Sequence, residues 1–149
     1  MKVFKNAQGQ NVNVVQHTLN ILKSNPTVQI HIGTDSQTKY SNTLYATVIA
    51  YRYGNRGVTF IASKQSFPKI NDLWSRLWKE AEMSIQIADW LTSQVNVSVQ
   101  IDMDYNEDKF QKSHILINAA KGWANSLGYQ VNVKPHVQVA TKAADYLIK

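Results

Sequence analysis

The order of the predicted strands and helices constrains the fold more than any other feature of the sequence. Three strand-like segments come first, with β-branched and aromatic residues at alternating positions, at residues 27–34, 41–53 and 58–65. Helices and strands then alternate, at residues 73–94, 95–103, 113–127, 129–133 and 140–148. Such alternation requires parallel crossover connections, so we predict an α/β fold with a mixed five-stranded sheet and helices on both faces.

The remaining residues fit the same domain, which we expect to comprise residues 1–149. An extra N-terminal helix is predicted at residues 13–23, because apolar side chains recur on one side of this segment and Pro26 follows it. Residues 1–4 have the pattern of a short strand, and residues 7–10 that of a turn. No linker, repeat or low-complexity segment is present, and 149 residues are enough for one hydrophobic core.

Composition excludes several classes of site. The chain contains no cysteine, which excludes disulfides, catalytic thiolates and zinc–thiolate sites, so a bound metal would need oxygen or imidazole ligands. No apolar stretch approaches the ~20 residues of a membrane span. Residues 1–10 lack the apolar segment of a secretory signal, and we therefore expect a cytoplasmic protein that does not contact a membrane.

The balance of charges is basic. The formal net charge is +6, from 16 Lys and Arg against 10 Asp and Glu. Such a charge attracts polyanions, which makes nucleic acid an expected partner, although the charge alone is equally consistent with a role in solubility. Five lysines in the C-terminal third could line a phosphate track or form ordinary solvated surface: Lys109, Lys112, Lys121, Lys134 and Lys142.

Two of the acidic residues lie where predicted strands end. Asp35 follows the alternating segment 27–34, and Asp102 lies near the end of the strand 95–103. If these two strands are parallel neighbours, the carboxylates can lie side by side, with ~4.8 Å between the strands, at the edge where α/β sheets build their sites. Asp104 could be an outer ligand, but its position is more typical of a solvated loop.

Two further acids lie on predicted helices. Glu80 falls on the apolar face of the helix 73–94, whereas Glu82 falls on the opposite, solvated face. A carboxylate that faces a core destabilises the fold unless it is paired, protonated or bound to a metal, and an ion pair with Arg76 is the alternative to a metal site here. Asp145, on the last helix, is by itself typical of a surface charge, and it becomes a candidate only as the fourth member of the set.

Four carboxylates in one place have a definite chemical use. Mg²⁺ and Mn²⁺ prefer oxygen ligands, and two such ions ~4 Å apart can clamp a phosphodiester, one activating water and the other stabilising the leaving oxygen. The four acids therefore predict a site for two Mg²⁺ or Mn²⁺ ions that hydrolyses nucleic acid.

Several short segments resemble the YkuK-like family of ribonuclease H-like proteins, over about residues 10–149: Ile32-Gly33-Thr34-Asp35-Ser36-Gln37, Ile101-Asp102, Gly122, Gly128, Val133-Lys134-Pro135 and Ala143-Ala144-Asp145. The resemblance implies a ribonuclease H-like fold and nuclease activity. Carried over by position, it implies four catalytic metal ligands: Asp35, Glu80, Asp102 and Asp145. The segment 133–136 is also similar to the histidine loop of true ribonucleases H, which makes His136 a candidate catalytic residue.

Other residues are candidates for substrate contacts. Ser36 and Gln37 follow Asp35 and could donate to a phosphate or a 2′-hydroxyl, or could equally close the turn at the end of the strand. Lys109 and Lys112 are candidates for contacts with substrate phosphates. The tryptophans of the helix 73–94, one turn apart at Trp74 and Trp78, could stack on bases or pack at the rim of the core.

Two functions of different classes remain open. The first is a metal-dependent nuclease of the ribonuclease H type, and the second is a catalytically silent ribonuclease H-like module that binds nucleic acid or a protein partner. Convergence of the carboxylates on one metal position favours the nuclease, whereas a pair between Glu80 and Arg76 favours the module. RNA, DNA and their hybrid all remain possible substrates, and the protein could be a monomer or a homodimer.

Overall fold

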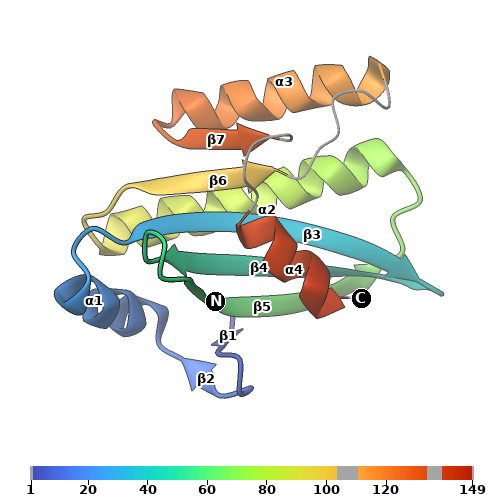
Figure 1. Ribbon diagram of the computed structural model, residues 1–149. Coiled ribbons are helices and arrows are strands. Elements are labelled where there is room, and N and C mark those ends of the chain that lie inside the picture. Colours follow the sequence, from blue (N-terminus) through green and yellow to red (C-terminus); the bar gives the residue numbers. More distant parts are fainter. Residues whose placement is uncertain (1, 104–110, 134–138, 149) are drawn as a thin grey trace.

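One mixed sheet organises the molecule (Figure 1). A computed structural model describes residues 2–103, 111–133 and 139–148, without the side chains of residues 111–114. Within these ranges seven strands lie in the order β2-β1-β5-β4-β3-β6-β7. Five of them form the predicted sheet: β3 (Gln29–Lys39), β4 (Asn42–Arg52), β5 (Val58–Pro68), β6 (Val99–Met103) and β7 (Gln130–Val133). Strands β3, β4 and β5 pair antiparallel, whereas β6 pairs parallel with β3 and with β7, as the connections require.

The prediction of five strands is wrong in number, because β1 (Phe4–Lys5) and β2 (Asn11–Val12) extend the sheet beyond β5. The turn between them is built by Asn6, whose Oδ1 accepts the backbone N–H groups of Gln8 and Gln10 at 3.0 Å. Gly9 adopts a φ of 81°, which glycine reaches without a steric penalty. Strands of two residues carry too little alternation to be recognised in the sequence.

Among the five predicted strands of the sheet, three boundaries differ from the prediction by three residues or more. Strand β3 continues to Lys39 instead of ending at Thr34, so Asp35 lies within the strand. The additional residues are polar and show no apolar alternation. Each of them nevertheless pairs with a residue of β4, and the last pair is Lys39 of β3 with Asn42 of β4. Strand β5 likewise runs on to Pro68, and β6 begins only at Val99. Pairing with a neighbouring strand therefore decides these boundaries.

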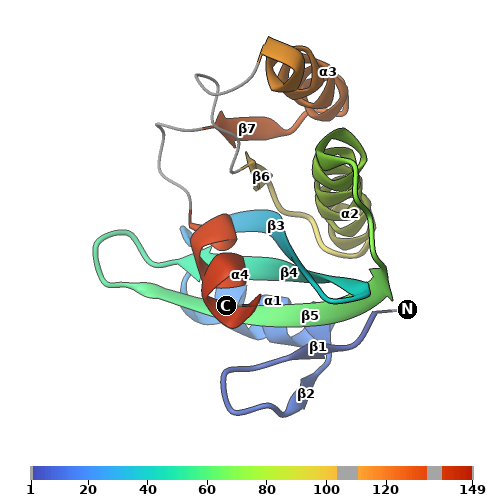
Figure 2. The same ribbon diagram turned by 90° about the vertical axis from the view of Figure 1, so that its right-hand side faces the viewer.

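The described residues form four helices that cover the sheet: α1 (Val14–Ser24), α2 (Leu73–Gln94), α3 (Gln111–Ser126) and α4 (Ala140–Ile148). The side chain of Asn13 caps α1 by accepting the N–H of Gln16, and that of Asp72 caps α2 by accepting those of Trp74 and Ser75. Figure 2 shows α4 in front of β4 and β5, with α1 behind them. In the described part of the chain no helix is long and apolar enough to cross a membrane.

The two faces of the sheet carry different side chains. The face covered by α1, α2 and α3, here called the α2 face, holds the large apolar core, which includes Ile32, Ile85 and Leu91. The opposite face, here called the α4 face, is packed mainly with small side chains: Ala46, Val48, Ala50, Ala140, Ala144 and Ile148. Small side chains on both partners allow α4 to lie close to the strands.

Candidate functional site

The alternation of strand β3 assigns its candidate residues to two faces. His31, Gly33, Asp35 and Gln37 belong to the α4 face, and Ser36 belongs to the α2 face. In the described ladder β6 pairs with β3 up to Gly33, which lies opposite Asp102. Asp35 therefore lies two residues, about 7 Å, farther along the strand than Asp102. The expected side-by-side placement of Asp35 and Asp102 is thus replaced by a diagonal one.

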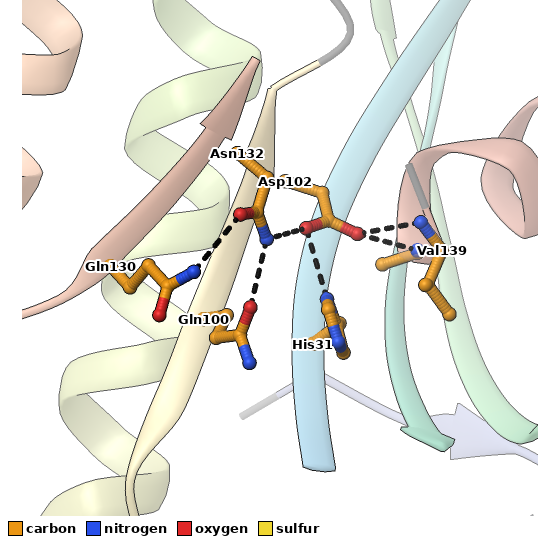
Figure 3. A network of polar contacts seen from close by, with 7 residues as sticks. His31, Gln100, Asp102, Gln130, Asn132 and Val139 are labelled. Carbon is orange, nitrogen blue, oxygen red and sulfur yellow. Dashed lines mark hydrogen bonds and ion pairs between the residues drawn. The ribbon is translucent and has the colours of Figure 1, made fainter. Parts of the chain in front are cut away.

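Asp102 lies in a dense network of polar contacts (Figure 3). It is 1% exposed. Its Oδ1 accepts from Asn132 Nδ2 at 2.8 Å and lies 3.1 Å from His31 Nδ1. Its Oδ2 accepts the backbone N–H groups of Val139 at 2.8 Å and Ala140 at 2.9 Å. Asp102 thus caps the N-terminus of α4 from a neighbouring strand, and both of its oxygens already have two contacts.

Gly33 allows this cap to form. A Cβ atom at this position would lie 2.9 Å from Cγ2 and 3.0 Å from the backbone nitrogen of Thr141. Contacts this short require movement of the helix, because the backbone nitrogen cannot rotate away. The absence of a side chain at Gly33 therefore lets the first turn of α4 reach Asp102.

Glu80 approaches β3 from the α2 face. It is 4% exposed, which agrees with the prediction that it points toward the sheet. Ser36, itself buried, donates its Oγ hydrogen to Glu80 Oε2 at 2.5 Å. Arg76, the alternative partner considered for Glu80, donates from Nη1 to Thr38 Oγ1 at 3.4 Å. The hydroxyl of Ser36 is therefore engaged beneath α2.

The charge of Glu80 acts on a buried neighbour. Burial, followed by the negative charge of Glu80, raises the pKa of Tyr45 to about 12, while the positive charge of Arg76 acts in the opposite direction. Tyr45 is fully buried on β4. The α2 face thus carries a carboxylate whose field reaches into the core.

Asp35 and Ser36 are consecutive residues on a part of β3 that lies beyond its described pairing with β6. Asp35 belongs to the α4 face of this edge, and the Ser36–Glu80 pair to the α2 face. The carboxylates of Asp35 and Glu80 therefore approach one edge of β3 from opposite sides. The backbone N–H of Ser36 donates to Asp35 Oδ1 at 2.8 Å.

Asp145 belongs to the helix that covers the α4 face. It is half-buried and lies one helical turn after Thr141, the residue above Gly33. The most buried residues of α4 are Ala140, Thr141, Ala144 and Ile148. The sequence predicts Ala143 and Leu147 on the inward side in place of Thr141 and Ile148. The buried side of α4 is thus slightly rotated from the predicted one. The observed rotation brings the side of the helix that carries Asp145 closer to the sheet.

The remaining candidates are placed less completely. Gln37 is half-buried on the α4 face, and its Oε1 is a buried acceptor without a hydrogen bond in the described structure. His136, Lys109 and the side chain of Lys112 lie outside the described residues, as does Asp104. Among the residues that are described, no three His, Asp or Glu side chains are grouped as a metal site requires.

Sequence reasoning missed the residues that surround Asp102. Neither His31 nor Asn132 is among the residues that the sequence predicts for a site. Strand alternation could have placed His31 on the same face as Asp102, but the contact with Asn132 depends on the register between β6 and β7, which pairs Asp102 with Asn132. The backbone donors of Val139 and Ala140 have no signal in the sequence at all.

Trp78 packs within the structure, in agreement with the second of its two interpretations. Its ring stacks on Trp123 of α3 with 5.5 Å between the centroids and an interplanar angle of 16°. Trp74 is 39% exposed beside it. Stacking on Trp123 occupies a face of the Trp78 ring that a base would otherwise use.

Comparison with known proteins adds a family. A family model described as Ribonuclease H-like matches residues 13–149, which include every candidate site residue. A comparison with curated proteins finds no match.

Proposed function

The chain belongs to the ribonuclease H-like family, and we propose that it is a metal-dependent nuclease that hydrolyses phosphodiester bonds of nucleic acid by a two-metal-ion mechanism. The observation that carries the proposal is the edge of β3, where Asp35 and the buried Ser36–Glu80 pair approach from the two faces of the sheet. A buried carboxylate at the end of a strand ladder is typical of a functional site, because its burial is otherwise unfavourable.

The donors at this edge fit a hard divalent cation. Asp35, Glu80 and Asp145 offer carboxylate oxygens, and the buried Oε1 of Gln37 is an acceptor without a described partner. Oxygen-only ligands select Mg²⁺ or Mn²⁺ over softer metals. When bound, two such ions would activate water and stabilise the leaving 3′-oxygen. Ser36 holds Glu80 in place through its hydroxyl, and Asp35 presents its carboxylate to the same edge.

Asp102 has a different part in this proposal. Metal ligation would require it to release donors from Asn132 or from the first turn of α4, because both of its oxygens are engaged. We therefore assign Asp102 as a positioning residue that fixes α4, and with it Asp145, above the strands. His136, as a proton carrier, and Lys109 and Lys112, as phosphate contacts, remain predictions from the sequence.

The second candidate function, a ribonuclease H-like module without turnover, is favoured by a specific observation. The four predicted ligands do not form one cluster in the described structure, and both oxygens of Asp102 are engaged, Oδ1 with Asn132 and Oδ2 with the N-terminus of α4. Such a module would bind nucleic acid or a protein partner through the same surface and would show no cleavage with any metal.

Cleavage assays separate the two functions. Labelled single strands, duplexes and RNA/DNA hybrids are incubated with Mg²⁺ or Mn²⁺ and the wild-type protein. Asp35→Asn and Glu80→Gln should each lower the rate by about a hundredfold or more while the protein stays folded, because each removes a charged ligand. Glu82→Gln, on the same helix, is the matched control and should cleave at the wild-type rate.

Each outcome bears on a particular assignment. If Asp35→Asn cleaves every substrate at the wild-type rate, the site is wrongly placed. Absence of wild-type cleavage together with retained binding would replace the nuclease by the module. Asp104→Asn belongs in the same series, since Asp104 follows Asp102 by two residues in the sequence. Loss of activity there, with activity retained in folded Asp102→Asn, would support the positioning assignment of Asp102.

A further inference from the structure

A groove lies on the α4 face, near the edge of the sheet that β1 and β2 form and several strands away from Asp102. The β1–β2 hairpin, strand β5 and the C-terminal end of α4 enclose about 620 Å³. Its described lining includes two lysines, two asparagines and an apolar floor: Lys5, Lys64, Asn6, Asn11, Phe60 and Leu147. No acidic side chain is among the described residues that line it. The groove is therefore basic at its rim and apolar at its floor.

The groove lies on the same face of the sheet as Asp35. Asp35 pairs with Ala46 of β4, and Ala46 pairs with Lys64 of β5, so the three residues form one row across the strands. Two strand spacings separate Asp35 from Lys64, which is about 10 Å. Lys5 of β1 pairs with Ala62 of β5 and extends the same face. Ala46, between the other two residues, is fully buried against α4, so the row itself is covered by the helix and only its two ends are accessible.

The lining matches the chemistry of an unpaired nucleotide strand. Exposed lysines contact phosphates, and an aromatic ring in a concave floor offers a surface for base stacking. Phe60 is half-buried against the α4 cluster, which fixes its ring at little further cost in entropy. Asn6 already holds the β1–β2 turn with its Oδ1, so Asn11 is the free amide candidate for contact with a base edge.

We infer that this groove binds single-stranded nucleic acid, on the same face of the sheet as Asp35 and about 10 Å from it. Stacking on Phe60 requires a base that is not paired, which favours a single strand over a duplex. The inference rests on the proposed function for the chemical class of the ligand, but binding itself requires neither metal nor cleavage.

Binding is measured by fluorescence anisotropy of a short labelled single strand, in EDTA, between about 50 and about 200 mM salt. Lys64→Glu should weaken affinity by about tenfold or more at the low salt concentration and flatten the salt dependence by about one unit of slope. Lys23→Glu is the matched control, because Lys23 is an exposed lysine of α1, and the same change of charge there should alter affinity less than about twofold. Equal losses of affinity in the two variants would contradict the inference that the groove binds the strand.

A second variant tests the stacking floor. Phe60→Leu keeps an apolar side chain but removes the ring, and it should weaken binding of the oligonucleotide by about tenfold. Competition by inorganic polyphosphate, which has charge but no bases, should be unchanged in this variant. Wild-type affinity of Phe60→Leu for the oligonucleotide would show that the floor does not hold a base and would overturn the inference. Circular dichroism establishes that each variant is folded before binding is compared.

The groove and the nuclease can fail separately. If Lys64→Glu weakens metal-free binding while no form of the protein cleaves any substrate, binding at the groove is supported and nuclease activity is contradicted. If the wild-type protein cleaves single strands and Lys64→Glu binds and cleaves them equally well, binding at the groove is contradicted and nuclease activity is supported.

Discussion

Helices α2 and α4 lie on opposite faces of one sheet, and different interactions hold them there. The α2 face is held by large apolar side chains such as Ile85 and Leu91, so its stability grows with buried area. The α4 face offers mostly alanine methyl groups, and a single carboxylate, Asp102, fixes the start of the helix. One face is therefore a general hydrophobic core, whereas the other depends on a few directional contacts beside the candidate site.

The largest expected effect lies on the α2 face. Leu91 is fully buried in α2, and Leu91→Ala should lower the free energy of unfolding by about 3 kcal/mol through lost burial and a residual cavity. Urea denaturation followed by tryptophan fluorescence measures the change. Leu19→Ala on α1 is the control, since Leu19 is 45% exposed and its truncation should cost less than about 0.5 kcal/mol. Similar losses at both positions would contradict the role of buried area on this face.

A smaller and more local effect is expected on the α4 face. Asp102→Asn replaces one acceptor oxygen by an amide nitrogen, which cannot accept from donors that now point at it. The free energy of unfolding should fall by about 2 kcal/mol. Hydrogen exchange should rise at residues 140–148 before it rises in α2, because the cap holds α4 alone.

Asp72→Asn provides a matched control for this prediction. Asp72 caps α2 from an exposed position, and asparagine serves as well as aspartate at such a cap, so the change should cost less than about 0.5 kcal/mol. If Asp102→Asn is as harmless as Asp72→Asn, or if exchange rises uniformly, the carboxylate does not fix α4.

The same contrast explains how much of the fold the sequence predicts. The bounds of α2 and α4 agree with the predicted residues 73–94 and 140–148, since apolar periodicity reports which side of a helix is buried. The polar end of β3 was missed because its residues 35–39 form a strand by pairing with β4, and pairing leaves no apolar pattern. The same limit applies to β1 and β2.

The candidate site shows a similar division. The inward direction of Glu80 follows from helical periodicity, and the structure confirms it. Its contact with Ser36, and the assignment of Asp35 and Ser36 to different faces, depend on the actual length and register of β3. The network of Asp102 unites β3, β6, β7 and α4, which are distant in the sequence. Hydrogen bonds between such segments leave no periodicity, so the sequence indicates the acids but not their partners.

The smallest expected effect is electrostatic and lies on the α2 face, where the charge of Glu80 acts on Tyr45. Burial and the negative charge of Glu80 raise the pKa of Tyr45 to about 12, from an ordinary value of 10.0. Between pH 10 and pH 12 the unfolded chain therefore releases a proton that folded Tyr45 retains, and stability should fall as the pH rises through this interval.

Glu80→Gln removes the negative charge but leaves Tyr45 buried, so the pKa of Tyr45 should move down and remain above 10.0. Ultraviolet absorbance of the phenolate measures this shift. Tyr51 is an internal control, because burial raises its pKa to about 12 and Glu80 is not among the causes. Glu82→Gln should leave both tyrosines unchanged. A pKa of Tyr45 that does not respond to Glu80→Gln would mean that Glu80 is neutral in the folded protein, and a neutral Glu80 would not be poised as an ionised ligand for a cation.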